Sequence, residues 1–282
     1  MRKETGNFEG RETKKLFFQK WLPDSDKIKA SIIAIHGWGT HSDRMEIPAS
    51  YLVEQGYAIY AFDLRGHWRN TGGLPGHIDS MDHIQKDIVL FKDLILEEAN
   101  QTKIFLMGHS FGGLVSIIFA INHPAISGIL ISSPLLGMFK KLSIGKKVIK
   151  TVSKSISKLA PTKILNNVID QNQLTSDLKI LRKHISDKNR INVISAKSAS
   201  EIDKFSKWAI ENASNLTCPV LVMQAGSDKI IDKEKTKDFF AGVKSKDKKY
   251  LEYEGFLHEL WNEKGRAQVF QDMYIWLEKH LK

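Results

Sequence analysis

The sequence is poor in cysteine, and this shortage limits the chemistry available to it. Cys218 is the single cysteine among 282 residues, which excludes an internal disulfide and indicates a reducing compartment. Because Cys218 directly precedes Pro219 at the start of an apolar run, we expect it to have a structural role. No C-x-x-C, H-E-x-x-H or other metal-binding spacing occurs, so the sequence predicts no metal and no cofactor.

The sequence pattern predicts neither a signal peptide nor a membrane-spanning segment. Residues 1–15 are charged and contain no apolar stretch, which argues against a signal peptide. The run from Ile104 to Ile121 has no Asp, Glu, Lys or Arg and is long enough for a membrane span. Glycines at positions 108, 112 and 113 interrupt it, so we interpret it as a buried strand followed by a buried helix. The sequence therefore predicts a cytoplasmic protein.

Acidic residues are missing from position 99 to position 169, in a chain whose net charge is +10. Val148, Val152, Ile156 and Leu159 recur there at helical spacing, which predicts an amphipathic helix. The lysines of this segment are Lys140, Lys141, Lys146, Lys147, Lys150, Lys154, Lys158 and Lys163. We expect this basic face to make peripheral contact with an anionic membrane surface, and the alternative is a face that is only solvated. No nucleic-acid motif accompanies the lysines, so no nucleic-acid partner is predicted.

The most informative segment that is present reads Gly108-His109-Ser110-Phe111-Gly112-Gly113. It follows the apolar run 103–107 and precedes the helix-like run 114–122. A G-x-S-x-G pattern in this position is typical of a nucleophile elbow, a sharp turn that exposes the serine hydroxyl over the end of a sheet. Small residues are needed two positions before and after the serine, because side chains there would collide with the neighbouring strand and helix. The sequence predicts that Ser110 is a nucleophile; the alternative is a solvated serine in a glycine-rich turn.

A carboxylate and a histidine follow Ser110 in the chain order that such a hydrolase requires. Asp228 lies just after the apolar run 219–224, where an orienting acid is expected. Asp232 is the alternative, but its place before a predicted helix favours a capping role. His258 lies on a loop after the last predicted strand, and we predict that it is the general base.

Three other histidines compete with His258 for the role of the base. His280 falls in the last turn of a predicted helix, where a cation is favourable. His184 lies in a charged helical stretch and is expected to face solvent. His109 neighbours Ser110, but the elbow should point it away, so we expect a packed histidine there.

Two backbone N–H groups are needed beside the serine to stabilise an oxyanion. Phe111, the residue after Ser110, would supply one of them. The other should come from the loop after an earlier strand, and His36-Gly37-Trp38-Gly39 follows the apolar run 31–35. The sequence therefore predicts the backbone N–H groups of Trp38 and Phe111 as the two donors.

Short apolar runs alternate with helical patterns along most of the chain. The predicted strands are 17–21 at a sheet edge, 31–35, 57–62, 103–107, 127–131, 220–224 and 249–253, and the predicted helices are 45–55, 78–100, 110–122, 233–241 and 264–280. This alternation predicts a mostly parallel sheet with helices on both faces and a site at the carboxyl ends of the strands. The alternation stops near residue 135 and resumes near residue 215. We therefore divide the chain into a core of residues 1–134 and 215–282 and an insertion of residues 135–214.

Seven segments of the chain together resemble the monoglyceride lipase and lysophospholipase branch of the α/β-hydrolases, which is related to the serine aminopeptidases. They are HGWGTHSDR at 36–44, YAIYAFDLRGH at 57–67, GHIDSMDHIQKDI at 76–88, GHSFGG at 108–113, ISSPLLGM at 131–138, QAGSDKIID at 224–232 and EGFLHELWNE at 254–263. The resemblance implies an α/β-hydrolase fold with a helical lid inserted before the strand that bears the acid. It implies the triad of Ser110, Asp228 and His258, with Trp38 and Phe111 as oxyanion donors.

Two tryptophans depart from the pattern of that family. Trp68 follows the D-x-R-G-H segment where the family usually has glycine, and Trp38 follows His36-Gly37 where a small or aliphatic residue is common. The oxyanion donor at position 38 is a backbone N–H, so a tryptophan side chain there does not remove it. We expect the two side chains to alter the shape of the mouth of the site. What is known of the substrates of relatives is therefore a poor guide to the substrate of this protein.

The function that these observations predict is that of a serine carboxylester hydrolase acting on monoacylglycerols or similar single-chain lipid esters through an acyl-enzyme. A lysophospholipase is an alternative of the same class. An aminopeptidase or amidase would need an acidic pocket for the substrate amine, for which Glu201 and Asp203 are the candidates. The sequence leaves the oligomeric state open.

Overall fold

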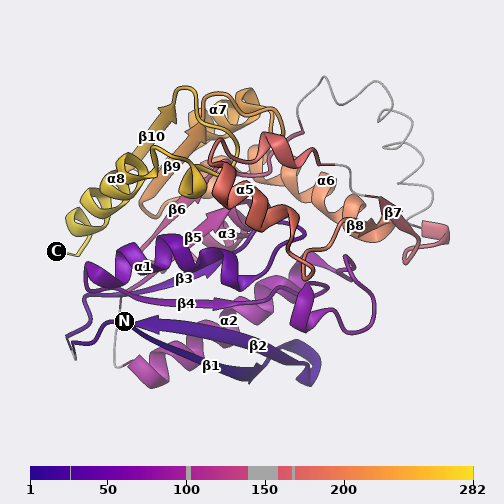
Figure 1. Cartoon of the computed structure of the whole chain (residues 1–282), viewed down its shortest axis with the longest axis horizontal. Helices are drawn as coiled ribbons and strands as arrows, with labels where there is room; N and C mark the ends of the chain where they lie inside the picture. The colour runs from indigo at the N-terminus through magenta and orange to yellow at the C-terminus, as the bar shows by residue number, and fades with distance from the viewer. Residues whose placement is uncertain (26, 100–102, 139–157, 167–168, 282) are drawn as a thin grey trace.

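The computed structural model describes residues 1–25, 27–99, 103–138, 158–166 and 169–281. An eight-stranded sheet runs through the molecule (Figure 1). Its strand order is β1-β2-β4-β3-β5-β6-β9-β10. The strands are β1 (Arg2–Glu9), β2 (Lys15–Leu22), β3 (Ser31–Ile35), β4 (Ala58–Phe62), β5 (Ile104–His109), β6 (Gly128–Ser132), β9 (Val220–Ala225) and β10 (Lys248–Tyr253). All pairs from β4 to β10 are parallel, whereas β1–β2 and β2–β4 are antiparallel. The predicted mostly parallel sheet is confirmed.

Helices cover both faces of this sheet, because the central strands are apolar on both sides. In β3, Ile33 and Ile35 belong to one buried cluster, whereas Ile32 and Ala34 belong to the other. The first cluster packs under α2 (Met81–Ala99), α3 (Phe111–Asn122) and α7 (Lys233–Gly242), and the second under α1 (Glu46–Glu54) and α8 (Arg266–Lys279). A fully apolar strand needs cover on both faces, and the two helical layers provide it. The fold is an α/β-hydrolase fold.

The N-terminal hairpin corrects one prediction. Segment 17–21 was predicted as an edge strand, but β2 lies between β4 and β1, which pairs with it from Arg2↔Leu22 to Glu9↔Lys15. Seven of the eight β1 residues are exposed or half-buried, and only Phe8 is buried. β1 has therefore almost no apolar pattern of its own and is held mainly by backbone pairing.

Between β6 and β9, the described residues contain both strands and helices. The elements are β7 (Ile164–Asn166), α5 (Leu178–Ile185), β8 (Val193–Ser195) and α6 (Ala196–Glu211), and β7 pairs with β8 in an antiparallel ladder that was not predicted. The predicted helix through Val148, Val152 and Ile156 lies outside the described residues. Leu159 is described and is 88% exposed. The division of the chain at residues 135 and 214 stays a prediction.

One stretch of this insertion is bonded directly to loops of the core. The Ile191 N–H donates to the Gly39 carbonyl at 2.9 Å, and the Ser195 N–H donates to the Gly76 carbonyl at 2.9 Å. Gly39 and Gly76 have φ values of +74° and +70°, and a Cβ at either would meet a carbonyl oxygen of the insertion. Figure 1 shows α5, α6, β7 and β8 gathered at one end of the sheet. In the part of the chain that the structure describes, no helix is both long and apolar enough to cross a membrane.

Candidate active site

Ser110 lies in the sharp turn between β5 and α3, with a positive φ of 53°. Its N–H donates to the Ser132 carbonyl at 2.9 Å, and its own carbonyl accepts from the Leu135 N–H at 2.9 Å. A Cβ at Gly112 would meet the carbonyl oxygens of Ile35 and His36 on the neighbouring strand end. The predicted elbow and its need for glycine are therefore present in the geometry.

Asp228 and His258 come together from the loops that follow β9 and β10. His258 Nδ1 donates to Asp228 Oδ2 at 2.7 Å, and both side chains are at most 5% exposed. The second carboxylate oxygen of Asp228 accepts from the N–H groups of Ile230 and Ile231, each at 2.9 Å. The carboxylate is thus fixed in a position that holds the imidazole with its Nδ1 protonated.

Each member of this pair changes the pKa of the other. Burial alone would raise the pKa of Asp228, but the charge of His258, its hydrogen bond and the two backbone N–H groups outweigh burial and hold the pKa below its usual value. Burial would lower the pKa of His258, but the charges of Asp228 and Glu259 and the hydrogen bond raise it above 6.5. Asp228 therefore stays ionised, and His258 titrates above the range of a free imidazole.

Asp232, the alternative acid, is bonded to a helix instead. It is the N-cap of α7, and its side chain accepts from the Glu234 N–H at 3.2 Å. This is the capping geometry that its position before Lys233 predicted. The structure thus brings Asp228, and not Asp232, to His258.

The two predicted oxyanion donors lie on the loop after β3 and at the start of α3, which pack against each other. Phe111 opens α3, so its N–H has no acceptor one turn earlier in the helix. The Trp38 N–H, on the loop after β3, donates to no other described residue. The Trp38 and Phe111 rings meet edge-on with centroids 5.3 Å apart. Gly37 lies against Ser110, because a Cβ there would be 3.6 Å from the Ser110 Cβ.

His36 holds this loop, a contribution that sequence reasoning missed. Its Nδ1 donates to the Gly37 carbonyl at 2.8 Å, and its Nε2 accepts from the Leu64 N–H at 2.9 Å. Complete burial lowers its pKa to about 3, so the ring stays neutral and keeps both bonds. The available signal was a histidine directly after a buried strand and before the glycine of the loop.

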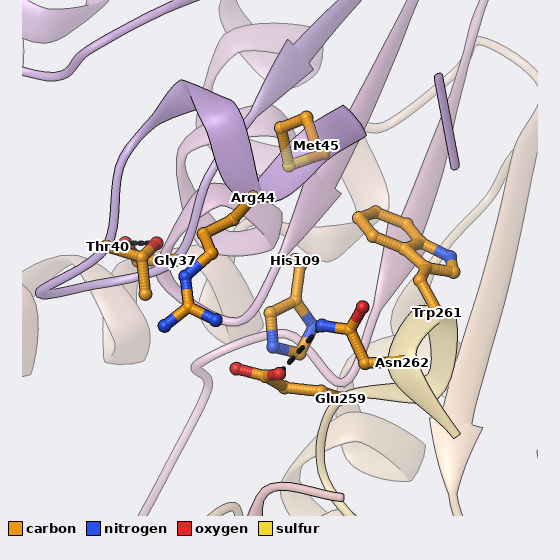
Figure 2. Close-up of a pocket in the computed structure, with 8 residues that line it drawn as sticks. All are labelled: Gly37, Thr40, Arg44, Met45, His109, Glu259, Trp261 and Asn262. Carbon is orange, nitrogen blue, oxygen red and sulfur yellow. Dashed lines mark hydrogen bonds between the residues drawn. The ribbon is translucent and has the colours of Figure 1, made fainter. Parts of the chain in front are cut away.

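A small pocket with about 20 Å³ of free space lies next to the Ser110 turn, through Gly37 and His109. It is lined by Gly37, Thr40, Arg44, Met45, His109, Glu259, Trp261 and Asn262. Figure 2 shows the Arg44 guanidinium, the His109 ring and the Glu259 carboxylate turned toward the same space. The Asn262 amide donates to Glu259 Oε2 at 2.8 Å. The pocket therefore has polar groups on one side, although most of the surface that lines it is apolar.

The prediction for His184 was wrong, and that for His109 was right about a packed ring but wrong about its direction. His109 does not point away from the site: it lines this pocket, its ring centroid is 4.7 Å from that of His258, and burial followed by the His258 charge lowers its pKa to about 3. His184 does not face solvent: it is 3% exposed, and its Nδ1 lies 3.1 Å from Glu259 Oε2. On α5 it shares the buried face with Ile180 and Leu181. Glu259 comes from a distant part of the chain, so no local pattern could reveal this partner.

The remaining candidate residues have structural partners. Trp38 is buried and donates through Nε1 to the Val193 carbonyl at 3.3 Å. Trp68 packs against the His41 ring at 4.4 Å. Glu201 accepts from the Met81 N–H at 3.1 Å, and Asp203 pairs with a lysine one helical turn away. Among the described residues, no cluster of His, Cys, Asp and Glu could hold a metal ion.

The family model described as Serine aminopeptidase, S33, matches residues 26–265 of the chain. The protein belongs to this family. It is a serine ester hydrolase, and the resemblance to monoglyceride lipases and lysophospholipases that the motifs indicated is confirmed.

Named relatives match this chain over nearly its whole length. Phospholipase YtpA of Bacillus subtilis is 30% identical over 266 residues, which are 93% of this chain and 100% of the relative. Human monoglyceride lipase is 27% identical over 275 residues, 94% of this chain and 87% of the relative. The crystal structure of Paleococcus ferrophilus monoacylglycerol lipase superposes with a TM-score of 0.84 at 28% identity, covering 94% of this chain and 99% of that one.

Proposed function

We propose that this S33-family enzyme hydrolyses monoacylglycerols or similar single-chain lipid esters, with Ser110 as nucleophile, His258 as base and Asp228 as orienting acid. The observation that carries the proposal is the 2.7 Å hydrogen bond from buried His258 to buried Asp228, on loops at the same sheet edge as the Ser110 elbow. Relatives named as monoglyceride lipases and as a phospholipase support the class of substrate.

The first half of the reaction would acylate Ser110. His258 Nε2 takes the proton from the Ser110 hydroxyl while the oxygen attacks the ester carbonyl carbon. Asp228 keeps Nδ1 protonated and stabilises the imidazolium that forms. The Trp38 and Phe111 N–H groups bind the oxyanion, and the loss of one such donor typically costs about 10²–10³ in rate. The bond between the carbonyl carbon and the alcohol oxygen then breaks, and His258 gives the proton to the leaving alcohol.

The second half would release the fatty acid. Water enters the place of the alcohol, His258 removes its proton, and the resulting oxygen attacks the acyl carbon. The ester bond to Ser110 breaks, and the proton on His258 returns to the serine oxygen. Arg44, Glu259 and Asn262 line the small pocket next to the Ser110 turn and offer the alcohol both donors and acceptors.

An aminopeptidase or amidase is the less favoured alternative. Its substrate amine would need a free carboxylate, but Glu201 accepts hydrogen bonds from Met81 and Lys197, and Asp203 is paired with Lys207. Glu259 is the carboxylate that lines the pocket, and it already accepts from Asn262. A lysophospholipase differs only in the head group and remains within the proposed chemistry.

We also propose that the protein is cytoplasmic and contacts anionic membrane surfaces peripherally through its insertion. Lys147, Lys150 and Lys154 lie outside the described residues. On α5, Leu178 and Ile185 are 60% and 57% exposed. The lysines and the arginine of the same helix are exposed as well. A basic surface with exposed apolar side chains suits anionic lipid.

The test is a substrate panel with wild-type protein and Ser110→Ala. p-Nitrophenyl esters of several chain lengths and 1-oleoylglycerol should be hydrolysed, aminoacyl anilides should not, and Ser110→Ala should remove ester hydrolysis without unfolding the protein. A fluorophosphonate probe should label the wild type only. Ester hydrolysis by a pure and folded Ser110→Ala protein at more than a small fraction of the wild-type rate would refute the assignment.

A further inference from the structure

The loop that carries His258 has a neighbouring strand on one side only. It follows β10, which is the last strand of the described sheet, so its one neighbour there is the loop after β9. On that side Asp228 accepts from the His258 ring at 2.7 Å, and the Ser227 N–H donates to the Phe256 carbonyl at 3.0 Å. A catalytic side chain needs firm support, because a misplacement of about 1 Å can cost about 10²-fold in rate.

The insertion contacts the other side of this loop. The His258 N–H donates to the Gln173 carbonyl at 3.4 Å, and the Glu259 N–H donates to the Leu174 carbonyl at 2.8 Å. Leu174 is buried in the first of the two core clusters. The backbone that offers these two carbonyls is therefore anchored, and it can hold the backbone of the base in turn.

Glu263 connects the same stretch of the insertion to the residue before His258. Its Oε1 accepts from the Leu257 N–H at 3.1 Å and from the Ser176 N–H at 2.9 Å, and its Oε2 accepts from the Ser176 hydroxyl. The side chain is only 2% exposed. A buried carboxylate is costly unless hydrogen bonds satisfy it, and here the donors come from the base loop and from the insertion. Glu263 is thus a bridge between the two.

Both neighbours of Ser176 hold the insertion end of this bridge in place. Thr175 is buried, and its hydroxyl donates to the Asn262 carbonyl at 2.7 Å. Asp177 is the N-cap of α5, and its carboxylate accepts from Arg266 Nη1 at 3.2 Å. Ser176 is therefore a fixed anchor for the Glu263 carboxylate.

We propose that Glu263 is a positioning residue for the general base. Through one oxygen it joins the Leu257 N–H to the Ser176 N–H, and it thereby fixes the loop so that the His258 ring keeps its bond to Asp228. In this role Glu263 contacts neither the substrate nor the reacting atoms. The inference rests on the proposed triad. It makes the stretch of the insertion around Ser176 part of the catalytic framework.

The experiment compares substitutions that remove the bridge with substitutions that keep it. Glu263→Met removes the acceptor at nearly the same side-chain length, whereas Glu263→Gln keeps Oε1 as an acceptor for both N–H groups. The control is Glu201→Met, the same chemical change at another buried glutamate. Glu201 lies on α6 of the insertion and accepts from a backbone N–H of the core, that of Met81, at 3.1 Å.

Glu263→Met should lower kcat for p-nitrophenyl butyrate by about 10- to 100-fold, as a displaced base predicts. KM should stay nearly unchanged, because His258 acts in both halves of the reaction and both would slow together. Labelling by a fluorophosphonate should slow as well. Glu263→Gln and Glu201→Met should stay close to the wild type in all three measurements. Glu263→Met and Glu201→Met should both unfold at lower urea concentrations than the wild type.

A proton NMR signal reports the position of His258 without a substrate. The Nδ1 proton that His258 donates to Asp228 should give a low-field resonance, which is identified by its absence in His258→Ala. Glu263→Met should move this resonance to higher field, because the hydrogen bond lengthens when the loop shifts. Glu263→Gln and Glu201→Met should leave it in place.

Three results would overturn the positioning role. Unchanged kcat and an unchanged resonance in a destabilised Glu263→Met protein would show that Glu263 only stabilises the fold. An equal loss of kcat in Glu201→Met would assign the effect to a loosened insertion. A loss in Glu263→Gln as large as in Glu263→Met would assign it to the charge and not to the bridge.

A shorter carboxylate decides the question if Glu263→Met does not fold. Glu263→Asp keeps the charge but is one carbon shorter, so it cannot reach the Leu257 and Ser176 N–H groups together. Wild-type kcat and a wild-type resonance in Glu263→Asp would contradict the proposal. A wild type that hydrolyses no ester and takes no fluorophosphonate label refutes the proposed function itself, whereas the resonance still tests whether Glu263 positions His258.

Discussion

At the scale of single residues, the two aspartates after β9 have different partners, and their substitutions should have different effects. Asp228→Asn should lower kcat by about 10³–10⁴-fold, because an amide can hold the wrong imidazole tautomer. Asp232→Ala should lower the free energy of unfolding by about 0.5–2 kcal/mol through the lost cap and leave kcat nearly unchanged. Steady-state kinetics and urea unfolding of both variants check this. The reverse pair of effects would show that Asp232 is the acid.

The pKa of His258 predicts how activity depends on pH. His258 acts as a base only when it is neutral, so kcat/KM should fall as the pH drops through its pKa, which is raised above 6.5. In Asp228→Asn the residual activity should lose its acid limb at a lower pH, because the carboxylate that raises the pKa is gone. His36 and His109 have pKa values of about 3 and should not contribute between pH 5 and 8. A pH profile with p-nitrophenyl butyrate measures this, and an unchanged midpoint in the variant would contradict it.

At the scale of elements, Gly112 joins the turn at Ser110 to the end of β3. In Gly112→Ala the new methyl group would press on the Ile35 and His36 carbonyls, so we expect a loss of about 3 kcal/mol in the free energy of unfolding, together with loss of ester hydrolysis. Gly73→Ala is the control, because Gly73 has a φ of +86° and no atom within 4 Å of the added Cβ. It should lose only about 1–2 kcal/mol, the cost of a left-handed backbone. Similar losses from urea unfolding of the two variants would show that the close approach of Gly112 is unimportant.

The elements that sequence reasoning found are those whose burial is visible along the chain. β3 and β9 are continuous apolar runs and were predicted nearly to their ends. β1 was missed because its side chains are mostly exposed and its stability comes from pairing with β2. Ser110, Asp228 and His258 were predicted as the triad because of their order in the chain and their places just after predicted strands. The surroundings of His184 could not be predicted, because they depend on a contact between the insertion and the distant loop that bears Glu259.

At the scale of the whole molecule, the positive charge of the insertion predicts a salt-dependent attraction to anionic vesicles. Replacing Lys147, Lys150, Lys154 and Lys158 with Gln should weaken vesicle binding by about 1 kcal/mol for each lysine at low salt and flatten its dependence on ionic strength. Hydrolysis of p-nitrophenyl butyrate should stay unchanged. Co-sedimentation with phosphatidylglycerol vesicles between low and high salt measures the effect, and a neutral phosphatidylcholine vesicle is the control. Unaltered binding by the quadruple variant would show that these lysines are only solvated.

The bonds from Ile191 and Ser195 to the Gly39 and Gly76 turns have a consequence for engineering. The insertion is hydrogen-bonded to the core at both turns, so residues 135–214 cannot be exchanged as an independent unit. A chimera that takes this stretch from a relative must also carry a compatible backbone at 191–195 and keep glycine at both turns. Some chimeras would exchange only the part of the insertion before residue 187 and keep the native residues 191–195. These should express and fold more readily than chimeras that exchange the whole insertion.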